Sequence, residues 1–247
     1  MEHSGRTWVL LDRVRSTSDY LREEIEAGRL GEAVVLARGQ TAGRGRHGRT
    51  WLSPGGGLYL TVSVPAIPDV QPVLHAVAGG LAVVDCLRDE LGIDAGLKWP
   101  NDVLVRDRKI CGLLAEMLPR GVQTFVLLGL GVNVAAVSPD QSLEYEPTSI
   151  AEELDGQPGP TPEALARRIV ERLDRKLAGL AEQGGEALLQ RWRARASTLG
   201  RRVRVRLPRG ELIGEAVDIR DDFALLVATD SGIEAVEVGD CLHLERP

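Results

Sequence analysis

The hydrophobic pattern of the chain changes once, at about residue 199, and the change divides the sequence into two parts. Before it, apolar residues recur at helical spacing in long segments, and strand-like runs accompany them. After it, the runs are short, punctuated by Gly, Asp and Ser, and typical of strands. We therefore predict a domain of helices and strands over residues 1–197 and a small β-barrel over residues 198–247. At its size, the barrel should rest against the first domain.

The expected elements follow from these periodicities. Helices are expected over Asp19–Ala27, Val73–Leu91, Pro162–Ala181 and Gly185–Ser197. Strands are expected over Glu32–Arg38, Leu58–Val64, Val103–Val105, Ile110–Met117, Thr124–Val134, Arg202–Leu207, Ile213–Ile219, Ala224–Thr229, Glu234–Val238 and Cys241–Leu244. The stretch Pro139–Pro162 is rich in Pro, Gly and acidic residues, which predicts a long loop.

Composition excludes several classes of protein. With 43% hydrophobic and 27% charged residues the chain is neither disordered nor a membrane protein, and apolar runs such as Val126–Val132 fall far below the roughly 20 residues that span a bilayer. No apolar core of signal-peptide length follows Met1–Arg6, so a cytoplasmic protein is expected. Its three cysteines are widely spaced and suit neither a disulfide framework nor a zinc site. The net charge of −6 argues against a general nucleic-acid coat.

A glycine- and arginine-rich loop spans Gln40–Gly57. Its centre, Gly43–Thr50, fits the dinucleotide fingerprint G-x-G-x-x-G and nearly fits the P-loop pattern, but both require the loop to open a helix. The following Trp51–Gly57 contains Pro54 and three glycines and cannot be that helix, so both motifs are rejected. Three closely spaced arginines can instead wrap around an anion, in a loop that should be mobile until the anion arrives. A solvated hairpin tip and a nucleic-acid contact are the alternatives.

A second segment, Lys98–Asp102, reads Lys-Trp-Pro-Asn-Asp. Pro100 restricts its own backbone and that of Trp99, so the lysine and the Asn-Asp pair can project toward one site. Such a set suits a nucleoside triphosphate, with the carboxylate toward Mg²⁺ and the ammonium toward phosphate. An Asn-Asp turn between two strands explains the same residues equally well. Likewise, Ser16 and Thr17 before a helix are typical of an N-cap.

Four segments, in this order, resemble the biotin protein ligases, and the resemblance covers nearly the whole chain. They are Gly43–Arg49 with Trp51, Lys98–Asp102, Lys109–Leu114 with Glu116, and Gly129–Asn133. The resemblance implies an α+β fold: a mixed β-sheet with helices, of the class II aminoacyl-tRNA synthetase kind, followed by an SH3-like barrel. It implies an ATP-dependent ligase that forms biotinyl-5′-AMP and pyrophosphate, with Mg²⁺ bound to the ATP. The biotinyl group then passes to a lysine of a biotin carboxyl carrier protein domain, for example of acetyl-CoA carboxylase. No N-terminal DNA-binding domain, DNA partner or membrane is expected, and a homodimer is left open.

The resemblance also implies roles for individual residues. The biotin-binding set is Ser16, Thr17, Ser18, Gln40, Gly43, Arg44, Gly45, Arg46, Lys98 and Gly112. The ATP-binding set is Arg44, Arg46, Arg49, Trp51, Asn101, Asp102 and Asn133, with Asp102 also as a ligand of Mg²⁺. The catalytic set is Arg46, Lys98 and Lys109. Ser18 and His47 depart from the family pattern, which has Asn and Arg there.

Two other functions share some of these sequence features. Lipoate ligases and octanoyltransferases share the fold, but their histidine-containing elements are not found; Gly55–Gly57 leads into Leu58 without a histidine. A nucleic-acid-binding module finds support in Arg191–Arg209, which holds eight arginines and no acid. Ten acidic residues follow in 210–247, so we expect neutralisation within the barrel.

Arginine dominates the basic residues, and only three of the 30 are lysines, Lys98, Lys109 and Lys176. Two of the three lie in the segments assigned to phosphate chemistry. A compact, hydrated ammonium on a flexible stem differs from the planar guanidinium fork. We therefore predict that Lys98 and Lys109 are required as lysines and that Lys176 is not.

Overall fold

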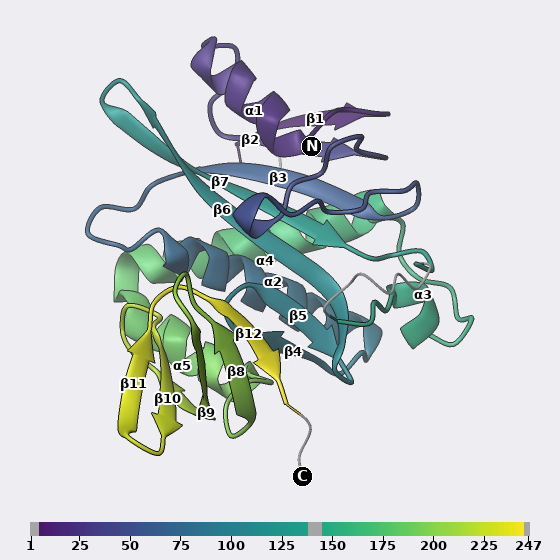
Figure 1. Cartoon of the computed structure of the whole chain (residues 1–247). Coiled ribbons are helices and arrows are strands. Elements are labelled where there is room, and N and C mark those ends of the chain that lie inside the picture. Colours follow the sequence, from purple (N-terminus) through teal and green to yellow (C-terminus); the bar gives the residue numbers. More distant parts are fainter. Residues whose placement is uncertain (1–4, 138–144, 245–247) are drawn as a thin grey trace.

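A seven-stranded sheet forms the centre of the computed structural model, which describes residues 5–137 and 145–244 (Figure 1). Its order is β1-β2-β3-β7-β6-β5-β4. The strands are β1 (Thr7–Leu11), β2 (Ala33–Ala37), β3 (Leu58–Pro65), β4 (Ala95–Lys98), β5 (Asp102–Val105), β6 (Arg108–Arg120) and β7 (Gln123–Val132). β1 and β2 are parallel and the other pairs antiparallel, so the predicted mixed sheet is confirmed. The sequence analysis did not identify β1 or β4 as strands.

Helices cover both faces of this sheet (Figure 1). They are α1 (Thr17–Glu26), α2 (Val73–Leu91), α3 (Ile150–Glu153), α4 (Pro162–Gln183) and α5 (Gly185–Arg195). One core joins α2 and α4 to one face, and a smaller core joins Leu21 and Ile25 of α1 to Phe125 and Leu127 on the other. This explains why β3 is buried along nearly its whole length, although its sequence alternates apolar and more polar residues.

The C-terminal part forms a second, all-antiparallel sheet of five strands in the order β11-β10-β9-β8-β12. They are β8 (Arg202–Arg206), β9 (Glu211–Ile219), β10 (Leu225–Thr229), β11 (Gly232–Val236) and β12 (Asp240–His243). Trp192 of α5 packs edge-on against Phe223 at 5.2 Å, and the indole of Trp99 donates to the Phe223 carbonyl at 3.0 Å. The predicted small β unit, resting on the first domain, is thus confirmed, and closure into a barrel stays a prediction.

The predicted loop Pro139–Pro162 differs from expectation where the structure describes it. Residues 139–144 of this loop lie outside the described residues. Residues 1–4, part of the N-terminal segment expected to carry no signal peptide, also lie outside them. From Tyr145 the chain returns to the sheet: Thr148 and Ser149 are buried, and the Ser149 side chain caps α3. The amide of Lys109 donates to Glu146, and Thr148 donates back to Lys109. Backbone pairing with β6, which composition does not reveal, makes this segment part of the core.

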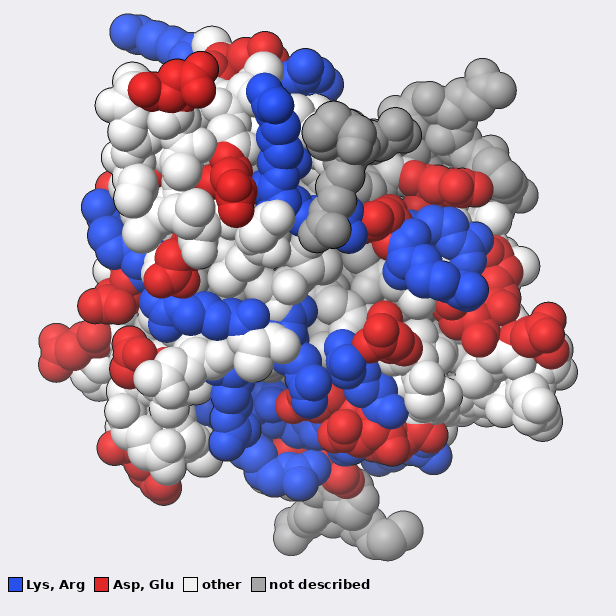
Figure 2. All heavy atoms as spheres, turned by 90° about the horizontal axis from the view of Figure 1, so that it is seen from below, with Lys and Arg blue, Asp and Glu red and all other residues white. Residues whose placement is uncertain are grey.

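Arginines of Arg191–Arg209 form ion pairs with nearby acidic residues. Arg193 pairs with Asp218 at 2.7 Å, and Arg204 with Glu211 at 3.5 Å. Arg201 pairs at 2.9 Å with Asp107, a residue of the first domain. The positive charge of these arginines is therefore neutralised only partly by acidic residues of the C-terminal unit. Figure 2 shows acidic side chains interleaved with basic ones over the face seen from below. Among the described residues, no helix is both long enough and apolar enough to cross a membrane.

Candidate active site

A cavity of about 180 Å³ opens between the first sheet, the arginine-rich loop and the C-terminal sheet. It brings together every site residue predicted from the sequence except Gly43. Gly43 does not line the cavity, and a Cβ there would come within 2.4 Å of the Trp51 carbonyl oxygen, so a glycine allows the two strands of the loop backbone to pack closely. Apolar walls are formed by Leu60, Leu113 and Leu130.

One end of the cavity is a cluster of buried hydroxyls at the start of α1. The Thr17 amide donates to the Gln40 side-chain oxygen at 2.9 Å. The hydroxyls of Thr17 and Ser18 lie 2.8 and 3.0 Å from that of Thr61. Ser16 caps α1, its Oγ accepting from the Asp19 amide at 3.4 Å, so the N-cap interpretation holds for this residue. These fixed donors and acceptors suit a small polar group on an otherwise apolar ligand.

At the other end, one carboxylate holds two lysines. Lys98 Nζ lies 3.2 Å from one Asp102 oxygen, and Lys109 Nζ lies 2.7 Å from the other. Burial alone would raise the pKa of Asp102, but Lys109 and Lys98 outweigh it and lower the pKa to about 2. The three groups therefore carry a net positive charge at neutral pH, which suits an anionic ligand.

The turn between β4 and β5 positions this charge cluster. Trp99 and Asn101 lie in the turn, and the Trp99–Pro100 peptide bond is cis. The predicted turn is confirmed, and it brings Lys98 and Asp102 together. The role of this segment in nucleotide binding stays a prediction. The Lys98 side chain is only 4% exposed, and its ammonium lies 4.3 Å from the centre of the Tyr145 ring. Lys98 is thus held from three directions, by the turn, the carboxylate and the aromatic ring.

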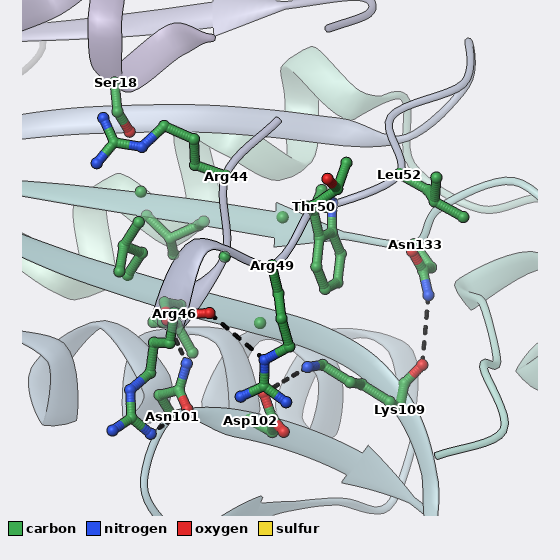
Figure 3. Close-up of a pocket in the computed structure, with 18 of the residues that line it drawn as sticks. Ser18, Arg44, Arg46, Arg49, Thr50, Leu52, Asn101, Asp102, Lys109 and Asn133 are labelled. Atoms are coloured by element: carbon green, nitrogen blue, oxygen red, sulfur yellow. Dashed lines mark hydrogen bonds and ion pairs between the residues drawn. The ribbon is translucent and has the colours of Figure 1, made fainter. Parts of the chain in front are cut away.

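The arginine-rich loop sends its side chains to opposite ends of the cavity. Arg44 points toward Ser18, whereas Arg46 and Arg49 lie on the side of Asn101 and Asp102 (Figure 3). Arg46 donates to the Asn101 side chain at 3.3 Å. Burial lowers the pKa of Arg46, and Asp240 and Asp102 partly offset this effect. No helix follows the loop, which confirms that neither nucleotide-binding motif applies.

Arg44 and His47 make no ion pair with the charge cluster of Lys98, Asp102 and Lys109 among the described residues. Arg44 pairs with Asp19 and Glu116 on the outer side of the loop. His47 has a left-handed backbone with φ of 54° and does not line the cavity. The structure therefore places His47, one of the two departures from the family pattern, outside the pocket.

Trp51 and Asn133 form the remaining wall. The Trp51 indole packs over Gly112 and Gly131, and Lys109 Nζ lies 5.4 Å from its centre. The Asn133 side chain donates to the carbonyls of Lys109 and Thr148 at 3.3 and 2.9 Å. Asn133 therefore ties the returning segment to β6 as well as lining the cavity.

The site residues predicted from the sequence do not include several polar or aromatic side chains, and one cysteine, that line or support the cavity. They are Thr61, Tyr145, Asp240 and Cys241. Each lies far along the chain from the motif residue that it approaches, so no local pattern signals it. Within 5–137 and 145–244, no cluster of three or more His, Cys, Asp or Glu could hold a metal ion. Both oxygens of Asp102 bind lysines, so a Mg²⁺ ion brought by a nucleotide would have to compete with them.

The fold and the site define an enzyme of the ligase class, built around a pocket with a hydroxyl-rich end and a positively charged end. Residues 10–133 match the biotin/lipoate A/B protein ligase family, and residues 198–244 match the biotin protein ligase C-terminal domain. The chain therefore belongs to the biotin protein ligases of this family.

Individual relatives agree with this assignment. The biotin–[acetyl-CoA-carboxylase] ligase of Mycobacterium tuberculosis is 35% identical, covering 98% of this chain and 91% of the relative. That of Paracoccus denitrificans is 31% identical, covering 88% and 92%. The solved structure of the biotin protein ligase from Aquifex aeolicus in complex with biotin and ATP has a TM-score of 0.82 at 25% identity, covering 96% of this chain and 97% of that one.

Proposed function

We propose that the chain joins biotin to ATP, giving biotinyl-5′-AMP and pyrophosphate, and then transfers the biotinyl group to the amine of a lysine, which releases AMP. The acceptor is a biotin carboxyl carrier domain, as the names of the acetyl-CoA-carboxylase ligase relatives suggest. The observation that carries the proposal is the shared carboxylate of Asp102, which fixes Lys98 and Lys109 in the cavity that also holds the hydroxyl cluster. The complex of the Aquifex aeolicus enzyme with biotin and ATP supports it.

The hydroxyl cluster favours biotin over lipoate. A ureido ring offers both hydrogen-bond donors and acceptors, which Thr17, Ser18 and Gln40 can meet. The dithiolane ring of lipoate offers neither, so binding it would leave buried polar groups unpaired. The match of the C-terminal residues to the biotin protein ligase domain points the same way.

The chemistry needs charge neutralisation more than an enzyme nucleophile. When the biotin carboxylate attacks the α-phosphate, several negative charges gather at one place. Fixed cations aimed at that place stabilise the transition state, and we assign this role to Arg46, Lys98 and Lys109. Mg²⁺ bound to the ATP phosphates would neutralise further negative charge, and Asp102 is the carboxylate that we assign as its ligand. The loop bearing Arg46 would exclude water from the mixed anhydride once it forms.

Arg49 and the neighbouring wall would complete the nucleotide side, with Trp51 beside the base, whereas Arg44, which points toward Ser18, would lie on the biotin side. We also propose that residues 1–197 act as the catalytic domain and residues 198–247 as a supporting domain. The cytoplasmic location and the lack of DNA binding stay predictions, and the oligomeric state stays open.

The test is direct: purified protein is supplied with α-labelled ATP and either biotin or lipoate, and the acyl-adenylate is separated by thin-layer chromatography. We expect biotinyl-AMP with biotin, and none with Lys98→Met. Lipoyl-AMP in place of biotinyl-AMP would show that the head-group assignment is wrong. A second assay measures transfer to a biotin carboxyl carrier domain and to the same domain with its acceptor lysine changed to arginine.

A further inference from the structure

The C-terminal sheet reaches across the cavity to the arginine-rich loop. Asp240, the first residue of β12, accepts a hydrogen bond of 2.6 Å from Arg49 Nη2. Arg46 Nη1 lies 3.4 Å from the carbonyl oxygen of Gly239. The nearest nitrogen of His47 lies 3.9 Å from the same Asp240 oxygen. Two neighbouring residues of the second sheet therefore meet the positively charged side of the loop.

The position of Asp240 is set by the packing of its strand. β12 pairs with β8, and a Cβ on Gly239 would lie 2.6 Å from the Val205 side chain, so this turn is tightly seated. Farther along β12, the His243 amide donates to the Tyr145 hydroxyl at 2.7 Å. The strand is thus held at both ends, and Asp240 projects into the cavity from a rigid base.

Charge gives this contact a consequence for nucleotide binding. A carboxylate and a phosphate both accept forked hydrogen bonds from a guanidinium, so they compete for the same arginine. Asp240 lines the same cavity as Lys98 and Asp102. A polyphosphate bound there would be attracted by Arg49 and repelled by Asp240. The phosphate and the Asp240 carboxylate would therefore compete for the hydrogen bond from Arg49 Nη2.

We propose that Asp240 takes the place of a nucleotide phosphate in the ligand-free enzyme. It holds Arg49, and with it the loop, against the C-terminal sheet until ATP replaces the carboxylate. This inference rests on the proposed function, because it places the ATP phosphates at Arg49. It gives the C-terminal sheet a part in the first half-reaction, as the donor of a displaceable anion.

Asp240→Asn tests the proposal, because it removes the charge and keeps the shape. Trypsin cleaves after arginine, so Arg44, Arg46 and Arg49 report directly on the loop. We expect the ligand-free variant to be cut about threefold or more faster than the wild type, as suits loss of a partly exposed ion pair. With biotin and ATP present, the two proteins should be equally protected. The KM for ATP should fall about threefold, while the KM for biotin stays unchanged.

Two matched variants separate charge from structure. Asp240→Glu restores the carboxylate and should bring cleavage and the KM for ATP back toward the wild type. Asp230→Asn removes an exposed acid elsewhere on the same sheet and should change neither.

Equal cleavage of ligand-free wild type and Asp240→Asn would overturn the proposal, and so would a raised KM for ATP in the variant. If the wild type forms no biotinyl-AMP, the proposed function fails, whatever the cleavage pattern. If it forms biotinyl-AMP but Asp240→Asn behaves as the wild type, only the role of Asp240 fails.

Discussion

Gly131 lies directly beneath Trp51: a Cβ on this glycine would come within 2.4 Å of the indole nitrogen. Gly112, its partner across β6 and β7, lies under the same ring, where a Cβ would be 2.9 Å from Cζ3. Two adjacent strands thus present backbone without side chains, and the indole packs flat on it. The wall of the cavity on the nucleotide side depends on this contact.

Gly131→Ala should therefore displace the indole without disturbing the strand. We expect the KM for ATP to rise about tenfold or more, since small misplacements at a reacting site are costly. Gly129→Ala is the matched control on the same strand, because its Cβ would lie 3.1 Å from Ser18 Oγ at the opposite end. It should raise the KM for biotin instead. Steady-state adenylation kinetics measure both, and an unchanged KM for ATP in Gly131→Ala would refute the packing argument.

Replacing Lys98 with arginine should impair adenylation although it keeps the charge. The ammonium contacts both Asp102 and the Tyr145 ring, and a longer, planar guanidinium would meet the two groups in a different geometry. We expect kcat to fall about a hundredfold for Lys98→Arg. For Lys109→Arg, whose side chain is 29% exposed, we expect about tenfold. Lys176→Arg keeps its ion pair with Asp85 and should match the wild type in pyrophosphate release.

Arg46→Gly should let biotinyl-AMP escape. The Arg46 side chain spans from the loop to Asn101 and the Gly239 carbonyl, and glycine loses both contacts. Released intermediate reacts with any exposed amine, so unrelated proteins in the mixture should become biotinylated on a streptavidin blot. Arg209→Gly, at an exposed turn, is the control and should label only the acceptor. Labelling confined to the acceptor in both variants would contradict the retention role.

His243 should make the protein less stable in mild acid. Burial first, and then Lys98 and Arg201, lower its pKa from 6.5 to about 4, while Asp107 acts in the opposite direction. Between these two pH values the unfolded chain binds a proton that the folded chain does not. This group therefore stabilises the fold fully above pH 6.5, and the stabilisation is lost as the pH falls toward 4. From pH 7.5 to 5 the loss should be about 2 kcal/mol.

Urea unfolding at the two pH values measures this loss. His243→Gln, which retains a hydrogen-bonding side chain for Thr198, removes the titration and should flatten that part of the pH dependence. An equally steep pH dependence in the variant would assign the effect to other groups.

The sequence patterns predicted the elements whose structure depends on interactions between residues close together in the chain. The helix Val73–Leu91 is found with the predicted bounds, because its apolar spacing runs unbroken over 19 residues up to Gly92. The motif residues converge on one cavity, as their resemblance to a known family implied. By contrast, β4 has four residues and little pattern of its own, and it exists because β5 pairs with it.

The sequence by itself determined the two-part organisation, the long helices, the family and the chemical character of the site. These depend on periodicity, composition and residues that are near neighbours in the chain. Only the tertiary structure decided that Asp102 binds two lysines at once, that Tyr145 covers Lys98 and that Asp240 holds Arg49. The last of these contacts joins residues 191 positions apart, and such pairing is set by how the two sheets pack. A local pattern carries no record of that packing.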